Sequence, residues 1–199
     1  LGLVECELAI SDLEMLARRK ERLHKIVRAG TADPRDMEAV CAAEETLGRV
    51  STLSGLEHKH LERLGDLGLI TARPVIYVAN VDEDDLLGEG EPASSARAYA
   101  QSRRSGFVAI CAKLEAEAVE MGDEGLALLE DMGVPEPGLA RVIREARRAL
   151  GIVTFYTVAG GIVSAWTAAA GARLSICAGS IHTDMGKGFI RAEVIPCSR

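Results

Sequence analysis

This sequence has few aromatic residues and no surplus of positive charge. Its 199 residues include three Phe, three Tyr and one Trp. The 23 Lys and Arg residues are outnumbered by 30 Asp and Glu residues, so the formal net charge at pH 7 is −7. This balance argues against a basic saddle that wraps duplex nucleic acid, although a local basic face remains compatible with it. We therefore expect no DNA-binding function.

Two spacings that are typical of metal centres are also missing. The five cysteines are widely separated and form no Cys-x-x-Cys pair of the kind used in zinc sites or dithiol redox chemistry. They are Cys6, Cys41, Cys111, Cys177 and Cys197. The four histidines show no His-x-x-x-His spacing. The cysteine pattern suits a reducing compartment, so we expect a cytoplasmic protein without a metal centre.

The composition permits a buried core. With 48% hydrophobic and 27% charged residues, the chain can offset its conformational entropy by burial, which argues against intrinsic disorder. Its length allows one ordinary domain or two small ones. The first ten residues include Glu5 and Glu7 and so do not resemble a targeting signal. Because the first residue is Leu1 rather than Met, we expect a chain that was processed, truncated or taken from a longer protein.

One long stretch lacks charge altogether. No charged residue occurs between Arg148 and Arg173, a length that can cross a bilayer as a helix. Residues 152–158 and 162–167 are rich in β-branched and aromatic side chains, however, and Ala159-Gly160-Gly161 separates them. This texture is typical of two strands joined by a tight turn. We favour a hairpin over a membrane span because a glycine pair and interspersed hydroxyl groups suit half-buried strands better than lipid.

The first third of the chain is predicted to be helical. Between residues 11 and 69, apolar residues recur at helical spacing. The first stripe consists of Leu13, Leu16, Leu23 and Val27. Residues 30–32 are predicted to end the first helix, and Asp33 is a candidate N-cap with Pro34 at the first position of the next helix. The simplest interpretation is an antiparallel helical hairpin with coiled-coil character that acts as an interaction arm.

The pattern changes at residue 73 to that of an α/β fold. Residues 73–80 form an almost continuous apolar run, as found in a parallel strand buried on both faces, and residues 106–112 form a second. A helix-capable segment at 93–102 lies between them, which predicts a strand, a right-handed crossover and a parallel strand. Polar residues at the carboxyl ends of such strands lie where open α/β sheets bind ligands.

The remainder is predicted to end in a small β-rich module. A turn-rich joint at 133–138 precedes a helix over residues 139–150, whose four arginines make it locally basic. These are Arg141, Arg144, Arg147 and Arg148. Beyond Gly151 the sequence predicts the hairpin described above and two further strands, at 173–178 and 189–194.

Six strings occur in an order that carries a resemblance. They are Glu7-Leu8-Ala9-Ile10-Ser11-Asp12-Leu13, residues 74–83, residues 111–117, residues 137–144, Ala165-Trp166-Thr167, and Ile181-His182-Thr183-Asp184 followed by residues 188–193. Together they resemble the YchF, or Obg-like ATPase, family of P-loop nucleotide hydrolases over essentially the whole chain. The resemblance implies a G domain with a parallel sheet, an inserted antiparallel coiled-coil arm, and a β-grasp-like TGS module.

The resemblance also divides the chain. It implies that residues 1–10 are the tail of the first G-domain segment, 11–70 the arm, 71–150 the C-terminal, base-binding half of the G domain, and 151–199 a partial TGS module. The family's Gly-x-x-x-x-Gly-Lys-Ser/Thr phosphate loop does not occur in this sequence and is expected before Leu1. The Mg²⁺ ligands and the water-positioning element are expected there too. We therefore predict no catalytic residues here, and no ATP or GTP hydrolysis by the chain alone.

The base-reading site is expected at the end of the first strand. Guanine-specific members of the superfamily read the base with Asn-Lys-x-Asp, and the equivalent string here would be Asn80-Val81-Asp82-Glu83. A longer acid at the fourth place and no Lys at the second remove the guanine-selective fork, and the family that the chain resembles accepts ATP as well as GTP. Asn80 offers one acceptor and a two-hydrogen donor, which can pair with an adenine edge. The alternative for Asn80 is a simple strand-end cap.

A second loop is expected to complete this site. By the resemblance, Cys111-Ala112-Lys113 is the last nucleotide-binding loop, where main-chain N–H groups approach the base and the Lys stem covers the ring. The residues predicted to bind ATP or GTP are therefore Asn80, Val81, Glu83, Cys111, Ala112 and Lys113. The alternatives are a small buried hydrophobe at Cys111 and a solvated helix-start residue at Lys113. Glu115 and Glu117 are expected to complement the N-terminus of the helix that they begin, rather than form a catalytic pair.

The resemblance further implies a ribosome or RNA partner, reached through the arm and the TGS module, for a nucleotide-dependent switch. We expect His182 to be held in a turn by Asp184 or Thr183 rather than to contact RNA. Trp166 is expected to lie in the core rather than stack on a base. Two alternatives remain: a non-catalytic adaptor with a vestigial nucleotide site, and a membrane-anchored protein that uses residues 150–171.

Overall fold

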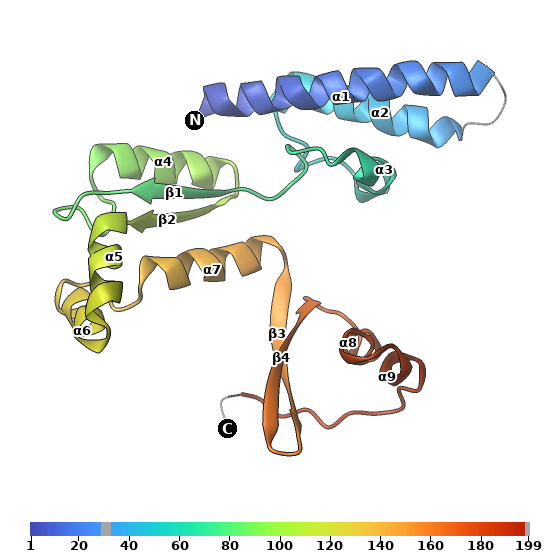
Figure 1. Cartoon of the computed structure of the whole chain (residues 1–199). Coiled ribbons are helices and arrows are strands. Elements are labelled where there is room, and N and C mark those ends of the chain that lie inside the picture. The colour runs from blue at the N-terminus through green and yellow to red at the C-terminus, as the bar shows by residue number, and fades with distance from the viewer. Residues whose placement is uncertain (29–32, 198–199) are drawn as a thin grey trace. The chain divides into compact units, whose positions relative to one another are not determined.

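The structure, a computed structural model, describes residues 1–28 and 33–197 and divides into two compact units, Leu1–Val75 and Ile76–Arg199. Figure 1 traces the elements in chain order from blue to red. The first unit is helical. The second contains a parallel strand pair, an antiparallel strand pair and the remaining helices.

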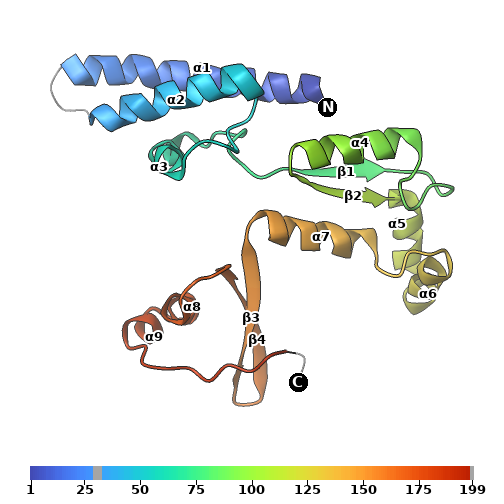
Figure 2. The same ribbon diagram turned by 180° about the vertical axis from the view of Figure 1, so that it is seen from behind.

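Two long helices that pack along each other form most of the first unit, as both views of the ribbon show (Figures 1 and 2). They are α1 (Gly2–Arg28) and α2 (Pro34–Val50). Leu16 of α1, Val40 of α2 and Leu53 are completely buried, so the apolar stripes face one another as their helical spacing predicts. The helical character predicted for this region is confirmed.

The first helix begins earlier than predicted. α1 starts at Gly2 rather than near Ser11, and it continues through Ser11 without a break. Ala9 is buried in the same core as Leu16, which carries the apolar stripe back by two turns. Glu5 lies in the first turn, where a carboxylate is favoured by the helix dipole. These two features extend the helix beyond the stretch that hydrophobic periodicity marked.

The start of α2 follows the sequence prediction. Asp33 has an extended backbone, its carboxylate accepts the Arg35 backbone N–H at 3.0 Å, and Pro34 occupies the first helical turn. The break predicted at residues 30–32 lies outside the described residues. A third helix, α3 (His58–Arg63), and a short 3₁₀ helix, η1 (Gly65–Leu67), complete the unit.

The second unit opens with the predicted strand, crossover and parallel strand. β1 (Ile76–Asn80) pairs with β2 (Gly106–Ile110), and α4 (Glu91–Ser102) connects them and packs on both. The prediction that both faces of the first strand are buried is wrong. Val78 is 46% exposed, because the described sheet has two strands and helices do not cover all of β1.

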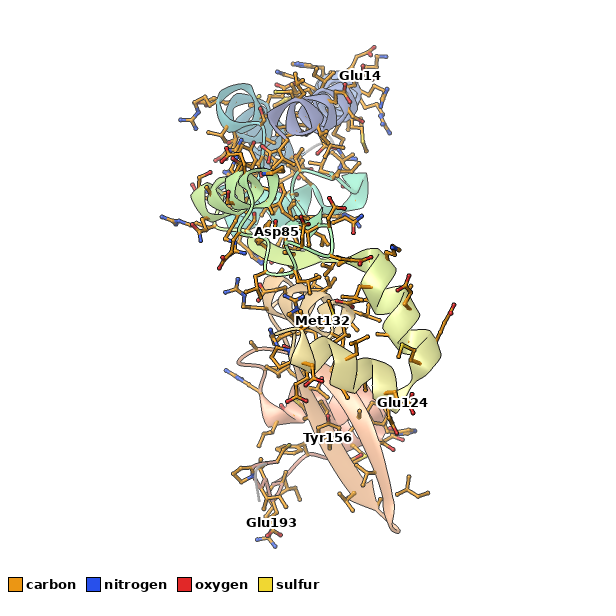
Figure 3. The ribbon with its side chains drawn as sticks, turned by 90° about the vertical axis from the view of Figure 1, so that its left-hand side faces the viewer. Glu14, Asp85, Glu124, Met132, Tyr156 and Glu193 are labelled. Carbon is orange, nitrogen blue, oxygen red and sulfur yellow. The ribbon has the colours of Figure 1, made fainter. Side chains whose placement is uncertain are left out.

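Three helices follow β2. α5 (Ala112–Met121) and α6 (Asp123–Asp131) pack against each other, and Figure 3 shows Glu124 and Met132 near the two ends of α6. Their core comprises Cys111, Leu114, Ala118, Leu129 and Val134. After the predicted turn-rich joint, α7 (Gly138–Ala149) packs on β1, β2 and the next strand.

The uncharged stretch forms an antiparallel hairpin, as predicted. β3 (Ile152–Ala159) pairs with β4 (Ile162–Ala169), with Phe155 opposite Trp166. Gly160 and Gly161, both with positive φ, form the two-residue connection, a conformation that suits glycine. Within the described part of the chain, no helix has the length and apolar character needed to cross a membrane.

The two strands predicted after the hairpin are wrong. Residues 174–181 form a helix, α8 (Leu174–Ile181), followed by α9 (Thr183–Lys187), while 189–194 adopt neither helix nor strand. α8 packs on β4 and α9 and buries Ala178, so tertiary contact overrides the strand-like texture of a short apolar run. Residues 189–194 pair with no strand in the described structure, and an extended segment without a ladder partner is not a strand.

Candidate functional site

The carboxyl ends of β1 and β2 lie side by side because the strands are parallel and in register. Asn80 at the end of β1 stands opposite Ile110 at the end of β2. The pairing extends one residue further, since the Val81 N–H donates to the Ile110 carbonyl at 2.8 Å. The two loops predicted to read a base therefore start from adjacent points.

A side chain ties the two loops together. The Asn80 Oδ1 atom accepts a hydrogen bond from the Ala112 N–H at 3.1 Å, across 32 positions of sequence. Ala112 is the first residue of α5, so its N–H has no acceptor within that helix. The Asn80 amide NH₂ group is not used by this bond and is available to donate to a ligand.

An ion pair forms a second bridge between the loops. Lys113 Nζ lies 2.8 Å from Glu83 Oε1, with both side chains largely in solvent. The hydrogen bond to Glu83 and the charge of that carboxylate raise the pKa of Lys113, so the ammonium form is favoured. Because both side chains are exposed, this ion pair contributes little to stability. Glu83 belongs to the loop after β1 and Lys113 to the start of α5, so the pair links the two loops.

A cavity of about 390 Å³ opens between the bridged loops. It is lined by Asn80, Val81, Asp82, Glu83, Asp84, Cys111 and Lys113. Five of the six predicted binding residues therefore line one cavity, and the sixth, Ala112, holds Asn80 in place. Asp82 and Asp84 were not predicted as site residues, although the acidic run that contains them is visible in the sequence.

The charge of this cavity restricts what it can bind. Three carboxylates and one ammonium group face it, which disfavours a phosphate group and suits an uncharged ring with hydrogen-bond donors and acceptors. Cys111 supplies an apolar wall, since it is buried with 6% exposure. Across residues 1–28 and 33–197, no three His, Cys, Asp or Glu side chains are grouped to hold a metal ion.

The loop beyond the cavity is held by its own contacts. The Asp85 carboxylate accepts the backbone N–H groups of Glu89 and Gly90 at 2.8 and 3.1 Å, and Figure 3 shows Asp85 beside α4. Arg97 of α4 donates to the Leu87 carbonyl at 2.7 Å. These contacts hold residues 85–90 against the start of α4.

Glu115 caps a helix, but not its own. Its carboxylate accepts the backbone N–H groups of Gly138 and Leu139, the first two residues of α7. Glu115 lies in the first turn of its own helix, α5, as expected, but its carboxylate bonds to the N-terminus of α7 instead. Sequence spacing did not indicate this partner, because the contact joins residues 23 positions apart.

Two side chains of the last module bond within it, although Trp166 is half-buried rather than in the core and His182 bonds to a backbone N–H rather than to a neighbouring side chain. His182 Nδ1 accepts the Asp184 backbone N–H at 3.3 Å and caps α9. The half-buried Trp166 donates through Nε1 to Thr157 Oγ1 at 3.0 Å across the hairpin. Each side chain has a hydrogen-bond partner within the module, which accounts for its position without RNA.

The fold is that of an α/β protein with two adjacent loops at the carboxyl ends of its parallel strands, and comparison with solved structures supports this fold. The structure of the Schizosaccharomyces pombe YchF GTPase superposes with a TM-score of 0.81 at 22% identity, covering 96% of this chain and 53% of that one. Residues 152–199 match the family model YchF-GTPase_C, described as a protein of unknown function (DUF933). Over nearly its whole length the chain is similar to proteins of the YchF family.

Curated relatives agree over nearly the whole chain. The ribosome-binding ATPase YchF of Haemophilus ducreyi is 37% identical over an alignment of 198 residues. The alignment covers 96% of this chain and 54% of the relative. The protein of the same name from Bacillus subtilis is 31% identical over the same shares. The chain thus spans about half the length of the curated relatives it matches.

Proposed function

We propose that this chain supplies the base-binding half of a nucleotide site, for ATP or GTP, in a ribosome-associated protein. The observation that carries the proposal is the cavity between the loops of β1 and β2, which Asn80 lines while its side chain is held by Ala112. Asn80 presents its amide NH₂ to a ring acceptor, Cys111 provides an apolar surface, and the Lys113 stem covers one side.

The Glu83–Lys113 pair bears on which base is accepted. Guanine recognition by a carboxylate needs an acid that is free to accept the ring N–H and the exocyclic amine. Glu83 is already bound to Lys113 at 2.8 Å. Adenine recognition does not require a hydrogen bond to that carboxylate. This arrangement therefore supports ATP as a ligand and accommodates GTP without selecting it.

The chemistry of hydrolysis is assigned to other residues of the parent protein. Phosphate binding needs positive or N–H groups, and the surplus carboxylates of this cavity oppose phosphate. The described residues also form no metal-holding group of three acids, His or Cys. We propose that the chain alone hydrolyses neither nucleotide. Robust phosphate release by the purified chain, lost on changing Asn80 or Glu83, contradicts this.

The proposed division of labour follows the architecture. Residues 11–70 act as an interaction arm of coiled-coil type, 71–150 as the base-binding part of a G domain, and 151–199 as a TGS-type module. Residues 1–10, proposed as the end of a preceding G-domain segment, are continuous with the arm because α1 runs through this boundary. Since the relatives bind ribosomes by name, we propose a ribosomal partner and a cytoplasmic location.

A direct experiment uses the two side-chain amides of the sequence. Asn80 is the sole Asn and Gln101 the sole Gln, so the chain gives two side-chain NH₂ signals in a ¹H–¹⁵N spectrum. Titration with millimolar ATP is expected to shift the Asn80 signal and leave Gln101, an exposed residue of α4, in place. An Asn80 signal that does not respond contradicts base binding here.

The second candidate function is a non-catalytic adaptor whose nucleotide site is vestigial. Exposed apolar residues on the hairpin favour it: Val158, Ile162 and Val163 are each more than 60% exposed. The same titration separates the two functions, because an adaptor with a vestigial site leaves Asn80 unchanged by ATP or GTP.

A further inference from the structure

The carboxylate of Glu115 joins two helices that are separate in sequence. Oε1 accepts the Gly138 N–H at 2.5 Å and Oε2 accepts the Leu139 N–H at 3.2 Å. These are two of the N–H groups that an α-helix leaves without an internal partner, here at the start of α7. A negative charge at this position also interacts favourably with the helix dipole.

The contact is closely fitted. Gly138 is buried, and a Cβ atom at this position would fall inside contact distance of Ile110 Cγ2 and Glu115 Oε1. Ile110 is the last residue of β2 and directly precedes the cavity residue Cys111. The start of α7 therefore rests on both sides of the Cys111-Ala112-Lys113 loop, on Ile110 before it and on Glu115 after it.

A continuous set of hydrogen bonds connects the cavity to α7. Asn80, which lines the cavity, accepts the Ala112 N–H at 3.1 Å through Oδ1. The Cys111 carbonyl accepts the Glu115 N–H at 3.0 Å, which fixes the first turn of α5. The Glu115 carboxylate then holds Gly138 and Leu139. Each step shares a loop or a helical turn with the next, so the three contacts form one connected path from the cavity to α7.

We propose that Glu115 is a positioning residue that couples occupancy of the Asn80 cavity to the docking of α7. The nucleotide part of this inference rests on the proposed function. Because coupling is reciprocal, a ligand that holds the loop tightens α7, and a partner that displaces α7 loosens the loop. α7 leads into β3 after two residues, and its Arg147 bonds to Thr154 of that strand, so the coupling extends to the hairpin.

The first test needs no ligand. Hydrogen exchange of single backbone amides is measured by NMR in Glu115→Ala, with Glu120→Ala as a matched control, since Glu120 is exposed on the same helix. Both a local cap and the proposed coupling predict faster exchange at Gly138 and Leu139 in Glu115→Ala. Coupling alone predicts that Ala112, which does not touch the Glu115 carboxylate, also exchanges about tenfold faster. An Ala112 rate equal to that of the wild type overturns the proposal.

A second variant covers the case in which Glu115→Ala does not fold. Glu115→Gln keeps an oxygen that can accept an N–H but removes the charge. It is expected to place the Ala112 exchange rate between those of the wild type and Glu115→Ala. If Glu115→Ala does not fold, Glu115→Gln decides alone: a raised Ala112 rate supports the coupling, and a wild-type rate overturns it.

The second test adds ATP. In the wild type, ATP is expected to slow the exchange of Gly138 and Leu139 several-fold, and Glu115→Ala is expected to lose this response while its Asn80 side-chain signal still shifts. An Asn80 shift without slower exchange in the wild type overturns the coupling and leaves the base site intact. An Ala112 response to Glu115→Ala with no Asn80 shift on adding ATP contradicts the proposed function and retains Glu115 as the residue that positions the loop.

Discussion

Asp12 and Thr71 lie 59 positions apart in the chain and are joined by two hydrogen bonds to one oxygen. Asp12 Oδ2 accepts the Thr71 backbone N–H at 2.8 Å and the Thr71 hydroxyl at 2.7 Å. The other oxygen, Oδ1, accepts the Ile70 N–H at 3.1 Å. Asp12 has no exposed surface, so a buried charge on α1 holds the segment that leads out of the first unit.

Removal of this carboxylate is expected to destabilise the helical unit strongly. Asp12→Ala leaves three donors without an acceptor, which costs about 3 kcal/mol or more of unfolding free energy. Urea unfolding followed by circular dichroism at the helical band measures the loss. Glu14→Ala is the control, because Glu14 is exposed on the same helix (Figure 3) and such changes usually stay within about 0.5 kcal/mol. Equal effects of the two substitutions contradict the role assigned to Asp12.

Two glycines are expected to respond to alanine in opposite directions. Gly138→Ala forces a methyl group against Ile110 and Glu115, which costs about 1–3 kcal/mol of stability. Gly48 lies within α2, with open space where a methyl group would be added, so Gly48→Ala is expected to stabilise its unit by about 0.5–1 kcal/mol. Urea unfolding measures both. A neutral Gly138→Ala shows that the start of α7 is not closely packed.

Base binding is expected to depend on Asn80. Asn80→Ala removes both the donor offered to a ligand and the acceptor that holds Ala112. ATP affinity is expected to fall by about 1–3 kcal/mol, the cost of leaving buried polar groups unpaired. Isothermal titration of the parent protein measures this, with Gln101→Ala as the control at an exposed amide. Unchanged affinity in Asn80→Ala places the base elsewhere.

The stability of the helical unit is expected to fall in acid, in part through Asp33. The Arg35 side chain and the Arg35 backbone N–H both bond to this carboxylate, which lowers the Asp33 pKa from 3.8 to about 2. A lowered pKa means that the charged form is favoured by folding. Its contribution is therefore complete above the unfolded-state pKa and is lost as the pH falls from about 4 toward 2.

Replacement of Asp33 tests this directly. In Asp33→Asn the unfolding midpoint in urea is expected to change less between pH 4 and pH 2 than in the wild type, since the titrating group is gone. Glu45→Gln, at an exposed position of α2, is the control and should keep the wild-type dependence. A variant Asp33→Asn with the same acid dependence as the wild type assigns that dependence to other carboxylates.

Local chemistry made several elements predictable. Gly160 and Gly161 supply the positive φ angles that a two-residue connection needs, so the hairpin could be placed from its turn. Asp33 and Pro34 marked the start of α2 in the same way. The loops after β1 and β2 could be predicted as neighbours because the carboxyl ends of parallel strands meet at one edge of a sheet.

Other features depended on contacts that no local pattern encodes. Residues 174–181 have the texture of a short strand, yet they form α8 because packing on β4 and α9 is available to a helix there. Glu115 could be predicted to favour a helix N-terminus, but its choice of α7 required Gly138 to lie against Ile110. In the same way, the burial of Asp12 required Thr71 to return to α1.

The sequence by itself determined the helical arm, the strand–crossover–strand unit, the hairpin and the identity of the loop residues, because periodicity, capping and turn chemistry act over a few positions. Only the tertiary structure decided how those residues are used. In the folded chain Asn80 bonds to the Ala112 N–H, Glu83 pairs with Lys113, and Glu115 accepts the Gly138 N–H at the start of α7. Such contacts join residues more than twenty positions apart, and their geometry exists only once the strands and helices have packed.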